Sequence, residues 1–567
     1  MPTENTHFKH FLTADFVPHE VFTPEDFNDE EIMLEEMTHK FVMNRVYPAL
    51  GSIEDQDFAV TVRLIKEAGE LGLISADIPE KDGGLELGKI SASIIAEKMA
   101  LGRSFSITFG GQTGIGALPI AYFGTEQQKA LYLPKILSGE TVAAYALTEP
   151  SSGTDAMSVK TTATLSECGT HYILTGEKQW ISNSSFAGIF IVYAKVNGQE
   201  FTAFIIEKQY KGVSIGQEEK KMGLKGSSTC SLILDHVKVP VDNVIGEVGR
   251  GHVIAFNILN IGRHKISATS LGTAKRSIEL AVNYANERLQ FSQPISSFNL
   301  IKNKLADMAI KTYASESSVY RTAGAMQDGF ESMKETNGSL GATIARYAVE
   351  CSINKVMSTE FLDFIVDEAL QIHGGYGYMS EYEIETLYRD SRVTRIFEGT
   401  NEINRILIAS TLLKAYELPD EKRNVDEGTL QQEKQTLQIM KNLYHAAIGA
   451  VRKNDLMNLN QEQETAAFIA DLAIGIYAAE SAILRTMKAI QVTGEVKNNL
   501  KICYTKVFVY ETSQLVAMKA LGILNHLGDD ETFSRTAGRL IMSSQEDTVE
   551  LKRYIADAII EAKKYVS

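Results

Sequence analysis

Apolar residues in the first quarter of the chain recur with the period of an α-helix. Phe58, Val62 and Ile65 fall on one helical face, and residues 88–102 form another apolar-rich helical run. No alternation typical of strands interrupts this region. The pattern therefore predicts an N-terminal helical domain over residues 25–142.

Near residue 143 the helical period gives way to short runs of β-branched and aromatic residues. Asn197-Gly198 separates two of these runs, and an Asn-Gly pair between strands is the strongest short-range signal for a type I′ hairpin. Residues 143–253 are therefore predicted to form a middle, mostly antiparallel β domain.

Helical periodicity then returns and continues to the end of the sequence. The patterns over residues 254–290 and 338–372 predict a helical bundle domain that spans 254–417. The polar stretch 417–435 is the best linker candidate, and residues 431–567 are predicted to form a C-terminal helical appendix. The expected fold class is mainly α with a central β domain.

The composition is that of a large globular protein. The 567 residues are 44% hydrophobic and 23% charged, which excludes intrinsic disorder and a collagen-like chain. A formal net charge of −16 argues against nucleic-acid binding, because phosphates need a basic surface. A few local Lys and Arg residues could still hold a small polyanion.

The four cysteines are far apart and form no CxxC pair, so neither a zinc ribbon nor a thioredoxin-type site is expected. We expect all four to be buried thiols in a reducing compartment, and we predict no metal site. The N-terminus lacks the apolar core of a signal peptide, and no run reaches ~18 uninterrupted apolar residues. A cytoplasmic protein is therefore expected, with membrane contact at most peripheral.

Common nucleotide-binding and hydrolase motifs are absent from the sequence. It contains no GxGxxG after a strand, no GxxxxGK[ST], no HExxH and no GxSxG. The order of elements also lacks βαβ alternation. A Rossmann site, a P-loop, a zincin and an α/β-hydrolase therefore all lose support.

Two segments of the middle domain offer hydrogen-bond donors and an aromatic ring. In YALTEPSSGTD (145–155), a tight turn exposes backbone N–H groups and the hydroxyls of Thr148 and Thr154, which suit a flavin edge or a phosphate. An ordinary domain-boundary turn explains the same sequence. Trp180, the only tryptophan, is either a core residue or a ring stacked on another flat ring, with Ser182 as a nearby donor.

Two arginines in the helical bundle also need an explanation. Arg263 lies on an otherwise apolar helix and requires a carboxylate or a ligand anion as its partner. Arg288 and Phe291 are three residues apart and share a predicted helical face. They either present a cation and an aromatic edge to a nucleotide or are a solvated Arg beside a core Phe.

Glu398 is the strongest candidate for chemistry. It follows the apolar pair Ile396-Phe397 and precedes Gly399-Thr400 at the turn into a helix that begins near residue 401, where burial would raise the carboxyl pKa. Such a group is a competent general base near neutral pH. It can also belong to a helix start capped by Thr400, and the two interpretations are compatible.

Several segments, taken in order over roughly residues 25–417, resemble the acyl-CoA dehydrogenase family of flavoproteins: LTEPSSGTD, GEKQWISN, EEKKMGLKGSST, QIHGGYGY and RIFEGTNEI. The segments NILNIGR and IFEGTNEI, together with the appendix, make the chain most similar to the very-long-chain acyl-CoA dehydrogenase branch. The resemblance implies the acyl-CoA dehydrogenase fold, with a β-barrel-like middle domain. FAD would extend between this domain, the bundle and a neighbouring subunit of a homo-oligomer, with a dimer expected.

The resemblance also implies which residues contact FAD. Among them, Glu402 stands where some relatives carry Gln. The implied cofactor-binding residues are Tyr145, Leu147, Thr148, Gly153, Thr154, Trp180, Ile181, Ser182, Arg288, Phe291, Gln371, Gly375, Thr400, Asn401 and Glu402. The adenine half would be held from the other subunit by Arg288, Phe291, Gln371 and Gly375.

For the reaction, the resemblance implies that Glu398 removes the α-proton of a long-chain fatty acyl-CoA while the β-hydrogen leaves as hydride. The product is a trans-2-enoyl-CoA, in the first step of fatty acid β-oxidation. Some branches carry the carboxylate at the position of Gly262 instead, which leaves Glu398 as the matching candidate here. The implied substrate-binding residues are Thr154, Asn260, Arg263, Phe397 and Gly399.

The expected electron acceptor is an electron-transfer flavoprotein. The alternatives are an acyl-CoA oxidase that uses oxygen, a non-catalytic assembly factor of the same fold and a helical scaffold without a cofactor. In the appendix, the apolar face from Leu437 to Val451 is expected to pack in a core or support a dimer rather than bind a membrane.

Overall fold

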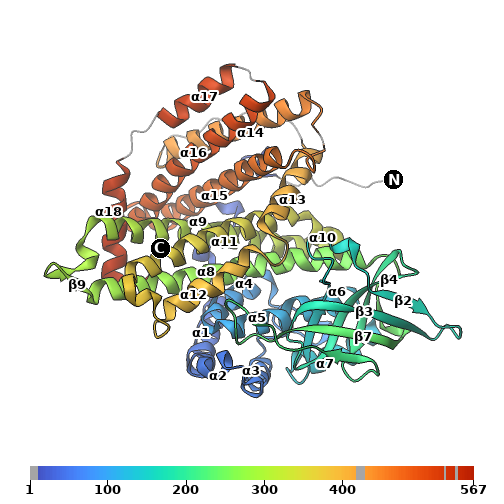
Figure 1. Cartoon of the computed structure of the whole chain (residues 1–567). Coiled ribbons are helices and arrows are strands. Elements are labelled where there is room, and N and C mark those ends of the chain that lie inside the picture. Colours follow the sequence, from blue (N-terminus) through green and yellow to red (C-terminus); the bar gives the residue numbers. More distant parts are fainter. Residues whose placement is uncertain (1–9, 337, 417–427, 457, 529–530, 543–546) are drawn as a thin grey trace.

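The computed structural model describes residues 10–336, 338–416, 428–456, 458–528, 531–542 and 547–567. The long helices of a central bundle separate two other parts of the molecule (Figure 1). The N-terminal helices and the β domain lie on one side of the bundle, and the C-terminal helices lie on the other. This is the mainly helical architecture with a central β domain that the sequence predicts.

The N-terminal helices are α1 (Asp29–Phe41), α2 (Leu50–Glu54), α3 (Phe58–Glu70), α4 (Gly88–Met99), α5 (Ser104–Gly110), α6 (Leu118–Phe123) and α7 (Glu126–Leu137). The predicted face of α3 is confirmed at Ile65, which is buried together with Leu64 and Ala68, but Phe58 and Val62 are only half-buried. Phe58 instead packs against Phe186 of the β domain, at 5.2 Å between ring centroids. A helical period alone does not determine which neighbour each side of a helix meets.

The β domain contains β1 (Val142–Ala146), β2 (Thr162–Leu165), β3 (His171–Ser182), β4 (Ala187–Val196), β5 (Glu200–Glu207), β6 (Val213–Ile215), β7 (Thr229–Pro240) and β8 (Val244–Ile245). The sheet order is β6-β7-β3-β2-β4-β5-β8, with β1 parallel to β4. Asn197 and Gly198 join β4 to β5 with φ of 52° and 74°. Positive φ at both positions is the type I′ geometry, so the predicted hairpin is confirmed.

The bundle contains α8 (Gly251–Glu287), α9 (Asn299–Thr336), α10 (Leu340–Arg346), α11 (Ala348–His373), α12 (Glu383–Ser391) and α13 (Asn401–Lys414). A small hairpin, β9 (Leu289–Gln290) and β10 (Gln293–Pro294), connects α8 to α9. The shared helical face predicted for Arg288 and Phe291 is therefore wrong, since α8 ends at Glu287. Phe291 has a φ of +50° in the hairpin turn, which no helix allows.

The C-terminal helices are α14 (Gln431–Lys453), α15 (Gln463–Thr493), α16 (Asn499–Leu527), α17 (Glu531–Met542) and α18 (Thr548–Ala562). The predicted linker 417–435 is wrong at its end, because α14 begins at Gln431, and residues 417–427 lie outside the described residues. The predicted apolar face is correct, since Leu437, Tyr444 and Val451 are buried in the core shared with the bundle.

Buried ion pairs attach this C-terminal unit to the rest of the protein. Arg485 of α15 contacts Glu316 of α9 at 2.6 Å and Glu25 of the N-terminal segment at 2.9 Å. Nearby, Glu480 lies 2.7 Å from Arg321 and 2.6 Å from Lys441. Because a buried charge is costly without its partner, these contacts fix how the helices dock.

Two helical segments among the described residues, Gln463–Thr493 and Val496–Leu527, are long and apolar enough to cross a membrane by length and composition alone. The search of the sequence for uninterrupted apolar runs did not identify these two segments, because polar residues interrupt both of them. Most of the apolar window of the first segment, and just over half of that of the second, is buried inside the protein. Packing in a helical core is therefore sufficient to explain their apolar character.

The prediction that the cysteines are buried is confirmed for three of the four. Cys230, Cys351 and Cys503 are buried free thiols, whereas Cys168 is exposed in the turn between β2 and β3. The prediction is wrong for Cys168 because a turn residue has no core to enter. Within the described part of the chain, no cluster of His, Cys, Asp and Glu could hold a metal ion.

Candidate active site

Glu398 lies in a short loop between the 3₁₀ turn Arg392–Arg395 and α13. Its φ is +56° and that of Gly399 is +81°, both in the left-handed region that a non-glycine residue rarely adopts. Thr400 then caps α13 by accepting a hydrogen bond from the Ile403 backbone N–H at 3.3 Å. The cap expected at this position and the candidate base therefore occur together in one turn.

Two cations hold this loop by its backbone. Nε of Arg263, from α8, donates to the Glu398 carbonyl oxygen at 3.1 Å, and Nζ of Lys355, from α11, donates to the Gly399 carbonyl oxygen at 2.9 Å. Arg263 also donates to Oδ1 of Asn260 at 2.8 Å. The expected carboxylate is therefore not a hydrogen-bond partner of Arg263: the arginine donates to neutral oxygens, and the Glu398 carboxylate acts on it only through its charge.

The Glu398 carboxylate points at a helix position that lacks a side chain. A Cβ atom added to Gly262 would lie 2.9 Å from Oε2 of Glu398. That oxygen is buried and has no hydrogen-bond partner among the described residues. A free carboxylate oxygen beside an open cavity can accept a proton from a bound molecule.

Burial dominates the electrostatics of this carboxyl group. Removal from water raises the pKa of Glu398 to about 7, while Arg263 and Lys355 act in the opposite direction. Burial also lowers the pKa of Lys355 to about 7. Glu398 therefore changes its protonation state near neutral pH, as a general base should.

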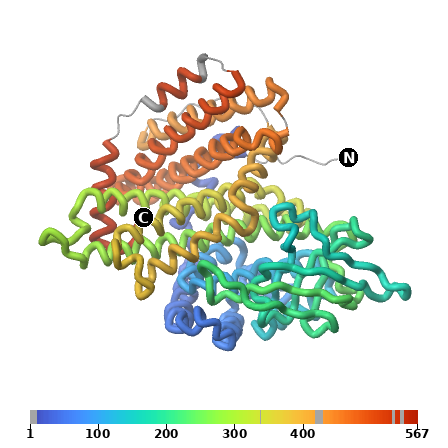
Figure 2. Tube along the Cα trace, in the orientation of Figure 1, coloured from blue at the N-terminus to red at the C-terminus, as the bar shows by residue number. Residues whose placement is uncertain are grey.

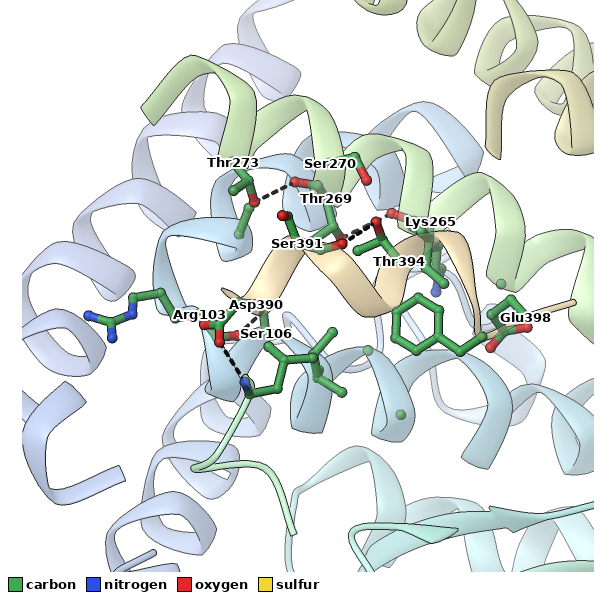
Figure 3. Close-up of a pocket in the computed structure, with 18 of the residues that line it drawn as sticks. Arg103, Ser106, Lys265, Thr269, Ser270, Thr273, Asp390, Ser391, Thr394 and Glu398 are labelled. Atoms are coloured by element: carbon green, nitrogen blue, oxygen red, sulfur yellow. Dashed lines mark hydrogen bonds between the residues drawn. The ribbon is translucent and has the colours of Figure 1, made fainter. Parts of the chain in front are cut away.

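A cavity of about 140 Å³ opens in front of Glu398 (Figure 3). Phe397 lines it beside Glu398, and α8 supplies one wall from Gly262 to Thr273. The opposite wall is rich in glycine, from α5 and from the π-helical turn Gly111–Gly116. Small residues on one wall leave room for a chain-like ligand that starts at Glu398.

The middle domain presents an aromatic ring and several polar groups near this cavity. Trp180 is 59% exposed and has a φ of +57° at an irregularity in the β3–β7 pairing, so the core interpretation is wrong. Ser182 lines the cavity with Glu398. Oη of Tyr145 is buried without a hydrogen-bond partner among the described residues, and no atom approaches the Cβ position of Gly153 within 4 Å.

The other middle-domain residues fall into two groups. Leu147 and Ile181 are buried, whereas Thr154 is exposed and Thr148 is half-buried in the turn that follows β1. An open ring, a free hydroxyl and an uncrowded turn fit the polar, planar ring system of a flavin. The assignments themselves stay predictions.

The residues expected to bind the adenine half lie elsewhere. Arg288 and Gly375 line a surface hollow of about 440 Å³, Phe291 is 90% exposed, and Gln371 is exposed at the end of α11. The hairpin β9–β10 projects from the end of the bundle opposite the β domain (Figures 1 and 2). The two predicted sets of residues therefore lie at opposite ends of the bundle.

The start of α13 supplies the remaining predicted residues. Glu402 is exposed, but Asn401 is 1% exposed, and its amide is already bonded inside the protein. Asn401 accepts from Lys355 at 2.6 Å and donates to Thr359 at 3.1 Å. The Asn401 side chain is therefore committed to the bundle and is not free for a cofactor.

Family models described as the N-terminal, middle and C-terminal domains of acyl-CoA dehydrogenase match residues 28–140, 144–237 and 249–413. A further C-terminal domain model of acyl-CoA dehydrogenase matches 439–535.

The chain belongs to the acyl-CoA dehydrogenase family.

A probable acyl-CoA dehydrogenase of Bacillus subtilis is 48% identical over 98% of both chains. The very long-chain specific acyl-CoA dehydrogenase of rat mitochondria is 41% identical over 62% of this chain and 52% of its own length. A crystal structure of an acyl-CoA dehydrogenase complexed with FAD from Bacillus anthracis superposes with a TM-score of 0.95. That protein is 48% identical, and the match covers 98% of this chain and 99% of the other.

Two lysines at the site, one buried and one half-buried, were missed by the sequence reasoning. Lys355 and Lys265 lie on helices whose patterns are apolar, so each needs an explanation of the kind given for Arg263. The sequence shows this signal, a charged residue on an otherwise apolar helix, at both positions. Only the structure shows that Lys355 reaches the Glu398 loop and that Lys265 lines the cavity.

Gly262→Ala should impair any reaction that uses Glu398. The new methyl group would meet the carboxylate at 2.9 Å, and a shift of about 1 Å in a catalytic group can cost on the order of 10²-fold in rate. Steady-state activity and bound-cofactor content measure the effect. Gly449→Ala, at a helical glycine with open space, is the matched control, and equal activities of the two variants would contradict the geometry.

Proposed function

We propose that this member of the acyl-CoA dehydrogenase family carries out the FAD-dependent α,β-dehydrogenation of long-chain fatty acyl-CoA to trans-2-enoyl-CoA. The observation that supports it most directly is the Glu398 carboxylate, which has a pKa of about 7 and a free oxygen at the mouth of a cavity. The relatives named above as acyl-CoA dehydrogenases support the same reaction class.

The residues of this chain can perform the proton-transfer part of that reaction. The thioester carbonyl acidifies the α-proton, and Glu398 would remove it through the oxygen that faces Gly262. The Glu398 backbone N–H would stabilise negative charge that develops on the thioester oxygen. Arg263 and Lys355 fix the loop, so that carboxylate and substrate meet without further rearrangement.

FAD is the proposed cofactor and, when bound, supplies the two-electron acceptor for the oxidised substrate. Tyr145, Trp180 and Ser182 would hold its ring system on the middle-domain side of the cavity. The B. anthracis protein was crystallised with FAD, which supports this choice.

The long-chain preference rests on the shape of the cavity and on the resemblance to the very-long-chain branch. Gly110, Gly111 and Gly114 line the wall opposite α8, and a second, smaller cavity adjoins the first. An electron-transfer flavoprotein as acceptor, β-oxidation as the pathway and a cytoplasmic location belong to the same proposal and stay predictions.

Anaerobic titration with acyl-CoAs of increasing length tests the proposed reaction. Palmitoyl-CoA should bleach the flavin band faster than butyryl-CoA, and Glu398→Gln should lose at least ~10²–10⁴ of the rate while staying yellow. Faster turnover of butyryl-CoA would contradict the chain-length proposal. Peroxide release in air would indicate an oxidase, and a colourless purified protein would indicate a scaffold.

The activity should depend on pH through Glu398. Because the base must be ionised and its pKa is about 7, kcat/KM should fall about tenfold per pH unit on the acidic side. Lys355 lowers the pKa of Glu398. Lys355→Met should therefore shift the acidic side of the kcat/KM profile to higher pH. Lys311→Met, at a lysine packed against Phe361 and Phe364, is the control and should keep the wild-type profile.

A homodimer that completes the cofactor site is also part of the proposal. Phe291→Asp on the projecting hairpin should reduce both the subunit association measured by light scattering and the FAD retained after gel filtration. Val496→Asp is the matched control, because Val496 is 93% exposed in the 3₁₀ turn between α15 and α16. Full FAD retention by a monomeric Phe291→Asp protein would refute the shared site.

A further inference from the structure

The wall of the proposed acyl cavity contains a lysine. The cavity in front of Glu398 adjoins a second cavity of about 40 Å³ that extends into the N-terminal helices. Both are lined by Ser106, Gly110, Lys265 and Thr269. Coenzyme A is too large for this inner cavity, so its occupant would be the distal end of the acyl chain.

Lys265 has few partners inside the protein. Its Nζ donates to the Thr113 carbonyl oxygen at 3.2 Å and lies 3.6 Å from Oδ2 of Asp77. The described residues give this ammonium group no further hydrogen bond, and its side chain is only 13% exposed. An ammonium group has three donors: one goes to the Thr113 carbonyl oxygen and one faces Asp77, so one remains for a ligand.

The carboxylate near Lys265 is already used by another lysine. Nζ of Lys89 lies 2.7 Å from Oδ1 of Asp77, and both side chains are less than one-tenth exposed. Oδ2 of Asp77, the oxygen nearer Lys265, has no hydrogen-bond partner among the described residues. Two buried ammonium groups thus share one carboxylate.

Burial and two charged neighbours act on the pKa of Lys265. Burial holds the pKa of Lys265 below its ordinary value; Asp77 acts in the opposite direction, and Lys89 lowers the pKa further. His264 lies next to it in sequence, and burial lowers the histidine pKa to about 4, so this ring is neutral at physiological pH. With both lysines charged, the cluster of Lys265, Lys89 and Asp77 carries one excess positive charge beside the inner cavity.

We propose that Lys265 forms an anion-binding site at the distal end of the acyl cavity and that the enzyme accepts acyl-CoA substrates with a terminal carboxylate. Such a carboxylate would take the unused donor of Lys265 and neutralise the excess charge of the cluster, whereas a terminal methyl group would leave that donor without a partner. This inference rests on the proposed function, because it needs the thioester to lie at Glu398.

The test compares two series of substrates on the holoenzyme. Monocarboxylic and dicarboxylic acyl-CoAs of matched length, from eight to sixteen carbons, are assayed by anaerobic flavin reduction. At each length, kcat/KM for the dicarboxylic substrate is divided by that for the monocarboxylic one. At the length that reaches Lys265, this ratio should fall at least tenfold in Lys265→Met, because a buried ion pair is lost.

Three further measurements make the outcome specific. Asp77→Asn removes the counter-charge and should raise the ratio, which a packing effect would not do. Lys311→Met, outside the cavity, should keep the wild-type ratio. In a Glu398→Gln background, calorimetry should show weaker binding of the dicarboxylic ligand when Lys265→Met is added.

A ratio that changes less than tenfold at every length in Lys265→Met overturns the inference. If that variant fails to fold, a ratio that does not rise in Asp77→Asn overturns it instead. Failure of the proposed function looks different, since no acyl-CoA of either series would then reduce the flavin of the wild-type protein.

Discussion

The active site depends on the electrostatic balance around one buried carboxylate, that of Glu398. Two cations bind the backbone of the Glu398 loop, and one oxygen of the carboxylate keeps no hydrogen-bond partner among the described residues. Burial alone would make Glu398 too weak an acid to ionise near neutral pH, and a direct ion pair would make it too weak a base. Arg263 and Lys355 avoid both extremes because they donate to backbone carbonyl oxygens. The pKa of about 7 is the result.

The fold supplies these partners from elements that are distant in sequence. Arg263 comes from α8 and Lys355 from α11, and both helices cross the middle of the molecule (Figure 1). Further buried ion pairs hold α8 to its neighbours. Lys275 contacts Glu97 of α4 at 2.7 Å and also Glu316 of α9, which in turn pairs with Arg485 of the C-terminal unit. The C-terminal helices therefore support the bundle against which the base is positioned.

The same helix α8 shapes what the site can accept. Gly262 leaves space for the reacting end of a ligand, whereas Lys265, one turn further along, puts a charge in the wall of the space behind it. The hairpin that follows α8 carries Arg288 and the exposed Phe291 away to the far end of the protomer. One continuous helix thus links the base, the acyl cavity and the surface proposed to complete a partner's cofactor site.

Local rules were enough to predict the order of the elements, the hairpin at Asn197-Gly198, the Thr400 cap and Glu398 as a buried base candidate, because each depends on neighbours in the sequence. Contacts over long distances were not accessible in this way. The break after Glu287 that separates Arg288 from the helix, the exposure of Trp180, and the meeting of Lys265 with Asp77 are set by tertiary packing. A periodic pattern shows that a residue is on a helix, but only the packed structure decides which cavity, partner or solvent that residue meets.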